Sequence, residues 1–112
     1  MKYAMLIHIK PGYFESMAEE EQKAISAEYM ALAEDPRARG GAQLQGIETA
    51  TTVRVRDGQT LTANGPYADA TEVFAGYYVF EAENLDQAIE LAARIPAARQ
   101  DGAIEVRPLA ER

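Results

Sequence analysis

The sequence has no cysteine and a single histidine, His8. Without cysteine, disulfide bonds, thiolate metal sites and cysteine nucleophiles are all excluded. A single histidine leaves only carboxylates to complete a metal site, which disfavours a dedicated zinc centre. We therefore expect neither a bound metal nor a cofactor.

Positive charge is also scarce, since 11 lysines and arginines stand against 18 aspartates and glutamates and give a formal net charge of −7. Proteins that bind nucleic acid use lysine and arginine to neutralise the phosphates. The balance of charge therefore argues against nucleic acid as a partner, and it equally disfavours an anionic membrane surface.

Long apolar runs are missing as well. No stretch approaches the roughly 20 apolar residues that a helix needs to span a membrane. Met1 and Lys2 lead directly into strand-like sequence, without the pattern of a signal peptide. These features lead us to expect a cytoplasmic protein.

What the chain does contain is the composition of an ordinary globular protein. It has 112 residues, of which 47% are hydrophobic and 26% charged. A chain of this length buries roughly two thirds of its unfolded surface around one core. We therefore expect residues 1–112 to form a single domain.

The first half of the chain predicts a strand and then a helix. Residues 2–9 are apolar at both alternating sets of positions, which is typical of a central strand covered on both sides. Ser16 and Glu19 have the spacing of a capping box, so we expect a helix to begin there and to end before Pro36. Its apolar stripe is formed by Ile25, Tyr29 and Leu32.

A short strand and a hairpin are predicted next. Residues 37–41 are polar and glycine-rich and read as a link, and residues 42–47 read as the strand that follows. Residues 52–56 alternate apolar and charged side chains and meet Asp57-Gly58, a strong hairpin signal, before the chain returns. One face of this hairpin is expected to be solvated.

The last third predicts strand, helix and strand. The segment 74–80 is the most aromatic strand of the sequence. Asn84 and Gln87 repeat the capping pattern and begin a second helix that closes before Pro96. A final strand is expected at residues 103–107. The inward stripe of the second helix is predicted to comprise Leu85, Ala88, Ile89, Ala92 and Ile95.

Without the hairpin, this order is βαββαβ, an α+β, ferredoxin-like pattern with two helices on one face of an antiparallel sheet. The first and the most aromatic strands are apolar on both sides, so the other face of the sheet would expose a large apolar patch. The simplest cover is a second copy related by a two-fold axis. We therefore expect a homodimer, with the functional site beside the seam.

One polar turn stands out between the hairpin and the aromatic strand. Asn64-Gly65-Pro66-Tyr67 combines residues that tolerate positive φ with a proline that fixes its own φ. The chain carries this turn, then Asp69 and Glu72, then Gly76-Tyr77-Tyr78, and finally a strand ending in Arg107-Pro108.

On these motifs the chain resembles the YCII-related family in its DGPF-domain branch, with Asn-Gly-Pro-Tyr in place of Asp-Gly-Pro-Phe. The resemblance implies a dimeric α/β-barrel assembly with clefts near the subunit boundary. It also implies kinship with a dehydrochlorinase-like branch that acts on a chlorinated hydroxyquinol, and with members associated with sigma-factor systems. Neither activity follows from a shared fold alone.

Seven residues are candidates for a site. Histidine is the residue type that titrates near neutral pH, so His8 is the first candidate for a general acid or base. Asp69 and Glu72 lie at i and i+3 and could form paired carboxylates. These three are the predicted catalytic residues, and the predicted substrate-binding residues are Asn64, Tyr67, Tyr78 and Arg107.

Each candidate also has a purely structural interpretation. His8 could be a hydrogen-bonded histidine at a strand end, and Asp69 and Glu72 could cap a short turn. Asn64 could serve the turn alone, because an asparagine fills an Asx-turn as well as an aspartate does. Arg107 could take part in an ion pair at the end of its strand.

Two functions remain open from the sequence. One is a cofactor-free enzyme that acts on a small polar or aromatic compound by acid–base chemistry. The other is a non-catalytic ligand-binding or regulatory dimer, which Asn64 favours because an amide cannot take up a proton near neutral pH. A pocket that contains His8 beside a carboxylate would support the enzyme, one lined by uncharged donors would support binding, and a sealed apolar cleft would leave a structural role.

Overall fold

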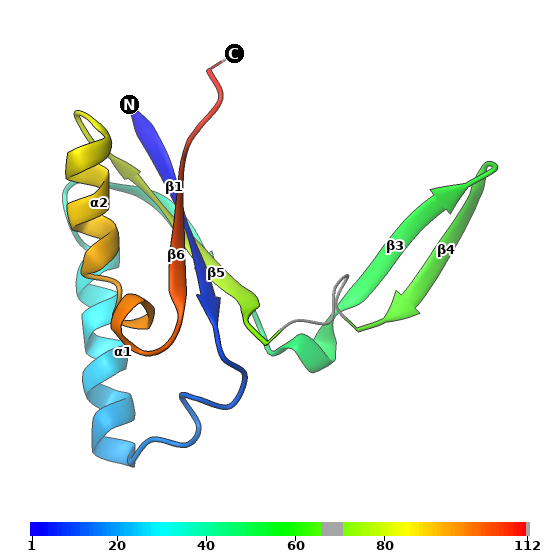
Figure 1. Ribbon diagram of the computed structural model, residues 1–112, viewed down its shortest axis with the longest axis horizontal. Coiled ribbons are helices and arrows are strands. Elements are labelled where there is room, and N and C mark those ends of the chain that lie inside the picture. Colours follow the sequence, from blue (N-terminus) through cyan, green and yellow to red (C-terminus); the bar gives the residue numbers. More distant parts are fainter. Residues whose placement is uncertain (66–70, 112) are drawn as a thin grey trace.

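The computed structural model describes residues 1–65 and 71–111 (Figure 1). Pro66, Tyr67 and Asp69 of the predicted site lie outside the described residues. The elements are, in chain order, β1 (Lys2–Ile9), α1 (Glu19–Ala33), β2 (Ala38–Gln43), η1 (Ile47–Thr49), β3 (Thr51–Arg56), β4 (Gln59–Asn64), β5 (Val73–Glu81), α2 (Leu85–Ala93), η2 (Pro96–Arg99) and β6 (Ala103–Pro108).

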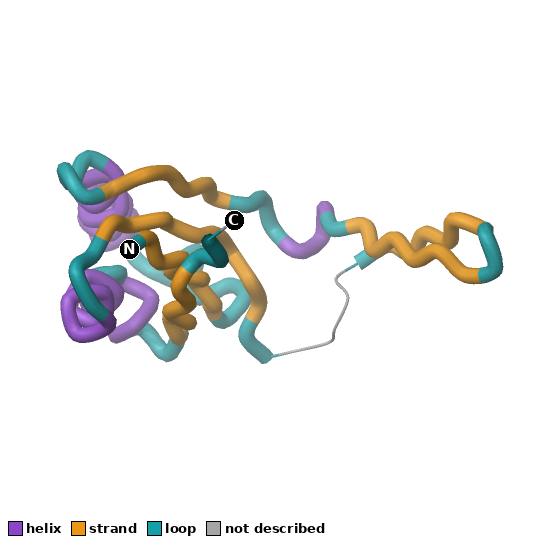
Figure 2. Tube along the Cα trace, turned by 90° about the horizontal axis from the view of Figure 1, so that it is seen from above, coloured by secondary structure: helices purple, strands orange, loops and turns teal. Residues whose placement is uncertain are grey.

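Four of the strands form one antiparallel sheet in the order β2-β5-β1-β6. Helices α1 and α2 cover one face of this sheet, as Figures 1 and 2 show from two directions. We call the sheet with its helices the body. The arrangement confirms the predicted α+β, ferredoxin-like fold, and it leaves the second face of the sheet without a helix.

The core lies between the sheet and the helices. Tyr3, Met5 and Ile7 alternate along β1 on the helix side, where Tyr3 pairs with Phe80 and Met5 with Tyr78 of β5. Phe80 and Met5 are completely buried. Side chains of alternate residues project from the same face of a strand, so the apolar pattern of residues 2–9 and 74–80 is what builds this layer.

The strand predicted at residues 42–47 is instead β2, Ala38–Gln43, and the predicted polar link is most of that strand. The reason is a close approach of two backbones. A Cβ on Gly41 would lie 2.5 Å from the carbonyl oxygen of Tyr77, and one on Gly76 would lie 2.7 Å from that of Ala42. The glycines let β2 pair tightly with β5, whereas glycine in a sequence usually indicates a loop.

The two predicted capping motifs have different outcomes. At α2 the prediction is confirmed, because the Asn84 side chain accepts a hydrogen bond from the Gln87 amide at 2.9 Å. At α1 the prediction is wrong: the helix begins at Glu19 after Ala18, and Ser16 Oγ donates instead to the Tyr13 carbonyl at 2.6 Å. The hydroxyl is used by the preceding turn and is therefore not available to the helix.

The prediction of the inward-facing residues of α2 is confirmed in part. Ala88, Ala92 and Ile95 are buried as predicted, but half of Leu85 and half of Ile89 are exposed. Leu91 takes the place of these two residues in the core. Leu85 and Ile89 therefore lie outside the buried side of α2.

Strands β3 and β4 form the predicted hairpin, and they pair only with each other. Asp57 and Gly58 both have positive φ, 52° and 77°, as a tight two-residue turn requires. Figures 1 and 2 show that this hairpin projects away from the sheet and its helices. We call residues 51–64 the arm.

Candidate functional site

The face of the sheet that carries no helix brings together His8, Glu105 and Arg107. His8 Nε2 lies 3.6 Å from Glu105 Oε1, and Arg107 Nε lies 4.0 Å from Glu105 Oε2. Strand alternation explains why these three side chains lie together. His8 projects from this face of β1, and Glu105 and Arg107 project from the same face of β6. We call this helix-free face of the sheet the open face.

A bulge places an aromatic ring beside His8. The pairing of β1 with β5 passes from Ile7 opposite Gly76 to His8 opposite Phe74, so β5 contains one extra residue at this point. The ring centroids of His8 and Phe74 are 5.8 Å apart. His8 therefore has a carboxylate on one side and an apolar ring on the other, and 30% of its side chain remains exposed.

The other predicted site residues lie elsewhere. Tyr78 is on the helix side of the sheet, where its hydroxyl donates to the Tyr29 carbonyl at 2.7 Å. Asn64 ends β4 at the base of the arm, and Glu72 is exposed just before β5. Tyr67 and Asp69 lie outside the described residues. Of the seven candidates, His8 and Arg107 are joined through Glu105.

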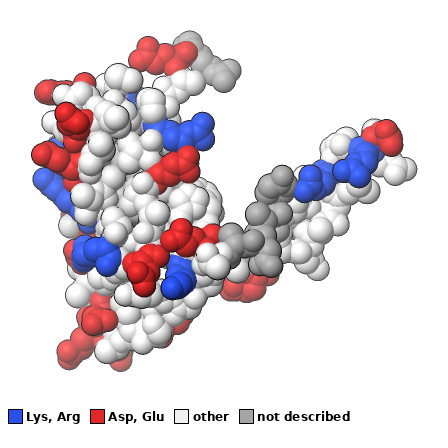
Figure 3. Space-filling model, in the orientation of Figure 1, with Lys and Arg blue, Asp and Glu red and all other residues white. Residues whose placement is uncertain are grey.

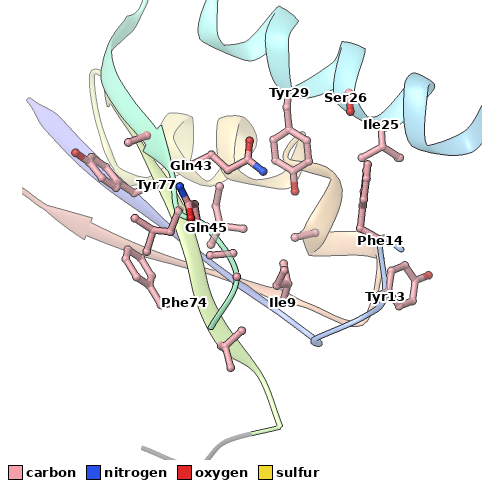
Figure 4. A pocket seen from close by; sticks show the side chains of 18 of the residues that line it. Ile9, Tyr13, Phe14, Ile25, Ser26, Tyr29, Gln43, Gln45, Phe74 and Tyr77 are labelled. Atoms are coloured by element: carbon pink, nitrogen blue, oxygen red, sulfur yellow. The ribbon is translucent and has the colours of Figure 1, made fainter. Parts of the chain in front are cut away.

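A cleft of about 690 Å³ lies between α1 and the sheet. Its lining comes from α1, β2, β5 and the loop that follows β1, and it includes Phe74 and Tyr77. His8 is not one of its lining residues in the described part of the chain. Figure 4 shows Tyr29 descending from α1 and Gln43 pointing toward it from β2. Its walls include Ile9, Phe14, Ile25, Tyr29, Gln43 and Gln45.

The helix side of β5 lacks a side chain at one position beside the cleft, where the backbone of β2 approaches. Tyr78 and Phe80 fill that side under the helices, but Gly76, next in the alternation, has only a hydrogen atom. The rings of Tyr29 and Tyr78, both lining residues, stack at a centroid distance of 6.4 Å.

The polar groups of the cleft are almost all neutral. Burial raises the pKa of Tyr78 to about 12, with a smaller contribution from the neighbouring Tyr29. Burial also raises the pKa of Tyr29, against the backbone amide of Ala97 and the positive charge of Arg99. Both phenols are therefore protonated at neutral pH, and the amides of Gln43 and Gln45 add donors and acceptors without charge.

Sequence reasoning identified neither Tyr29 nor Gln43 and Gln45 as site residues. Tyr29 was predicted only as part of the apolar stripe of a helix, and residues 42–47 only as a strand. A signal was present in the glycines, because Gly41 and Gly76 both accompany a close backbone contact beside the cleft. A glycine inside an aromatic strand indicates either such a contact or space for a ligand.

Two further observations concern other kinds of site. In residues 1–65 and 71–111, no three histidine, cysteine or acidic side chains are grouped closely enough to hold a metal ion. Neither α1 nor α2, the α-helices of the described chain, has the length and apolar character of a membrane span.

Comparisons with known proteins cover the whole chain. The family model for the YCII-related domain matches residues 1–111. An uncharacterised protein of Rhizobium meliloti is 29% identical over 115 residues, which span 98% of this chain and 93% of that protein. Among solved structures, the chain is similar to a 5-chloro-2-hydroxyhydroquinone dehydrochlorinase of Burkholderia phenoliruptrix in complex with 2,5-dihydroxybenzoquinone. The TM-score is 0.58 at 15% identity, with 98% of this chain and 94% of the other covered.

Proposed function

The chain belongs to the YCII-related family, and from that premise we propose that it is a small-molecule-binding protein. Its ligand is a compact, hydroxylated aromatic or quinone-like ring, held in the cleft between α1 and the sheet. The observation that carries the proposal is the lining of this cleft, in which neutral donors face apolar walls. We also place the chain, as part of the proposal, in the DGPF branch of the family and in the cytoplasm.

The size and chemistry of the cleft suit such a ring. Ligand pockets are usually 300–1,000 Å³ with mostly apolar walls and a few placed polar groups, and this cleft has about 690 Å³. Ile9, Phe14 and Ile25 offer apolar contacts to the faces of a ring. Gln43 and Gln45 can bond ring hydroxyl or carbonyl groups. Among the described lining residues Glu15 is the one with a charged side chain, so a strongly charged ligand is disfavoured.

The comparisons support the same class of ligand. The similar solved structure is a complex with 2,5-dihydroxybenzoquinone, a flat ring with two hydroxyl and two carbonyl oxygens. At 15% identity that similarity concerns the fold. The proposal of a ligand for this chain therefore rests on its own cleft. Under the criterion set from the sequence, a pocket lined by uncharged donors favours binding over catalysis.

Titration calorimetry with 2,5-dihydroxybenzoquinone tests the proposal. We expect saturable binding by the wild type and roughly 5- to 20-fold weaker binding by Gln43→Leu, which removes about one hydrogen bond. Gln59→Leu, an exposed glutamine on the arm, is the matched control and should bind as the wild type does. Absence of binding by the wild type, or equal losses in the two variants, would show that the cleft is not the site.

A second candidate function is acid–base catalysis on the open face. It rests on the 3.6 Å approach of His8 Nε2 to Glu105 Oε1, with Arg107 on the far side of the carboxylate. Asn64, Tyr67, Asp69 and Glu72 stay site residues proposed from the sequence alone. If the protein is an enzyme of this kind, His8→Ala abolishes turnover of a chlorinated hydroquinone and leaves ring binding in the cleft intact. Turnover that survives the substitution would remove His8 from any mechanism.

We further propose that the working unit is a homodimer in which the open face is covered. Phe74 and Tyr77 are 40% and 36% exposed on this face in the single chain, and contiguous apolar surface of this kind usually marks an interface. Light scattering after gel filtration tests the assembly. A mass of one chain at every concentration would contradict it.

A further inference from the structure

The arm has one uncharged face that residues 1–65 and 71–111 leave exposed. Val53 and Val55 project from this face of β3 and are 58% and 69% exposed. Thr62 and Thr60 of β4 lie opposite them, so the face consists of β-branched side chains. We call it the valine face. The other face carries Arg54 and Arg56, because successive residues of a strand point to opposite sides.

Contacts within the described part of the chain do not account for the stability of the arm. A two-stranded hairpin is marginally stable in water by itself, and it becomes stable when a hydrophobic face packs on something else. Neither valine belongs to the core of the described chain or packs against it. Yet the turn at Asp57 and Gly58 is well suited to a hairpin, and Gly65 continues the pairing at the base by donating to the Ala50 carbonyl at 2.8 Å.

The arm also differs from the body in the sign of its charge. It contains two arginines and one aspartate, a formal charge of +1, and the chain as a whole has −7, so −8 remains on all other residues. Figure 3 shows basic groups and one acidic group near the tip of the arm, and both acidic and basic groups over the body. A surface that attracts the arm is therefore acidic, and two bodies without arms would repel each other.

We propose that the arm of one copy packs through its valine face on the body of a second copy, and that the second copy returns the same contact. The inference rests on the homodimer proposed above and goes beyond it, because it makes the arm a principal contact of the pair. A two-fold arrangement requires that each chain supply both the arm and the surface that receives it. A second copy is the partner that offers both, because its body has the opposite net charge to the arm and exposes Phe74 and Tyr77 as apolar cover.

Sedimentation velocity on the full chain is the first test, with a negative charge placed on either side of the arm. Val55→Asp puts a carboxylate on the valine face, and Gln59→Asp puts one at the neighbouring cross-strand position on the opposite face. We expect Val55→Asp to weaken the dimer by about tenfold or more, since it buries a charge in an apolar contact. Gln59→Asp should leave the dissociation constant within about threefold of the wild type.

The outcomes separate the two proposals. A wild type that is monomeric at all concentrations overturns both the homodimer and the role of the arm. A wild-type dimer that Val55→Asp leaves intact overturns the arm contact alone and leaves the open face as the seam. Binding of 2,5-dihydroxybenzoquinone in the cleft is measured separately, so its failure bears only on the proposed ligand.

The absence of cysteine allows a second, direct test, because one introduced thiol is unique. Bimane attached to Val55→Cys should show blue-shifted emission as the protein is concentrated, in step with the mass, whereas bimane on Gln59→Cys should stay in a water-like environment. A blue shift at Val55→Cys that is independent of concentration would mean that the arm folds onto its own chain. That result, or equal spectra for the two labels, would overturn the proposal.

Discussion

The body and the arm have the same kind of sequence pattern, but the body buries its apolar side chains and the arm exposes them. In both, strands alternate β-branched or aromatic residues with other side chains, and tight turns join them. The body buries its apolar side against its own helices, with Phe80 completely inaccessible. The arm leaves Val53 and Val55 in water. Alternation therefore predicts that a strand forms, but it does not say which molecule covers the strand.

The largest expected effect is in the core of the body. Phe80→Ala should lower the free energy of unfolding by about 3 to 5 kcal/mol, because it removes a fully buried ring and leaves a cavity. Val55→Ala in the arm removes a side chain that is mostly exposed, and at concentrations where the chain is monomeric it should cost under about 0.5 kcal/mol. Urea denaturation followed by circular dichroism measures both.

Either substitution, Phe80→Ala or Val55→Ala, can contradict the difference in burial between the body and the arm. A loss below about 1 kcal/mol for Phe80→Ala would mean that the helix side of the sheet is loosely packed. A loss for Val55→Ala in the monomer that approaches the one for Phe80→Ala would mean that the valine face is buried within its own chain. Either result would remove the distinction between body and arm.

The next effect concerns the strand that leads from the body toward the arm. Gly41→Ala should cost about 2 kcal/mol, because its φ of 152° disfavours a side chain and its Cβ would lie 2.5 Å from the Tyr77 carbonyl oxygen. Gly40→Ala is the matched control: its φ is 150°, but no atom lies within 4 Å of the added Cβ. It should cost about 1 kcal/mol. Equal losses would assign the whole effect to φ and none to the contact between β2 and β5.

The sequence predicted best what depends on a few neighbouring residues. Asp57-Gly58 predicts its hairpin because the turn needs positive φ at two adjacent positions, and Asn84 predicts the start of α2 because the capped amide is three residues away. The order of strands and helices follows from such signals. These local signals do not show which strand or helix each segment packs against. For this reason the start of β2 was predicted four residues too late.

Competing local contacts explain the remaining errors of the fold. Ser16 has the right spacing for a cap, but its hydroxyl had a nearer carbonyl at Tyr13. Gly41 reads as a loop residue until Tyr77 of a distant strand is placed beside it. The first outcome is a choice between two local partners, and the second depends on a strand that tertiary structure brings within reach, which no short window of sequence contains.

The candidate site shows the same limit. His8 and Arg107 were predicted as separate site residues, and the structure joins them through Glu105, which was not among the candidates. Tyr78 lies on the other side of the sheet, facing Tyr29 of a helix 49 residues away. The cleft is lined by side chains from α1, β2 and β5, so it could be found only after these elements were assembled.

A smaller effect, with a defined pH dependence, is expected at the turn between α1 and β2. Hydrogen bonds from the Arg37 side chain and then from its backbone amide lower the pKa of Asp35 from 3.8 to about 2. The guanidinium lies 2.9 Å from Asp35 Oδ2, and 16% of the carboxylate side chain is exposed. Asp35→Asn should therefore cost about 1 kcal/mol at neutral pH, after allowance for screening by water.

The sign of this dependence follows from the lowered pKa. Stabilisation by a carboxylate whose pKa is lower in the folded state is complete above the unfolded value of 3.8 and is lost as the pH falls toward about 2. The difference between the wild type and Asp35→Asn should shrink across that window and vanish below it. Glu34→Gln, an exposed neighbour, is the control. A difference that persists unchanged at pH 2 would show that the loss comes from packing and not from the ion pair.

The smallest effect is expected at the tip of the arm, from the same kind of substitution as Gly41→Ala. Gly58 has a φ of 77°, and no atom lies within 4 Å of an added Cβ, so Gly58→Ala strains the turn without a clash. In the monomer we expect nuclear magnetic resonance shifts of residues 53–61 to move toward unpaired values, while the unfolding free energy of the body changes by less than about 0.5 kcal/mol. The reason is that the arm shares no core with the body, so local opening does not propagate to it. If Gly58→Ala instead lowers the stability of the body as far as Gly41→Ala does, arm and body unfold as one cooperative unit, and the valine face must be packed within a single chain.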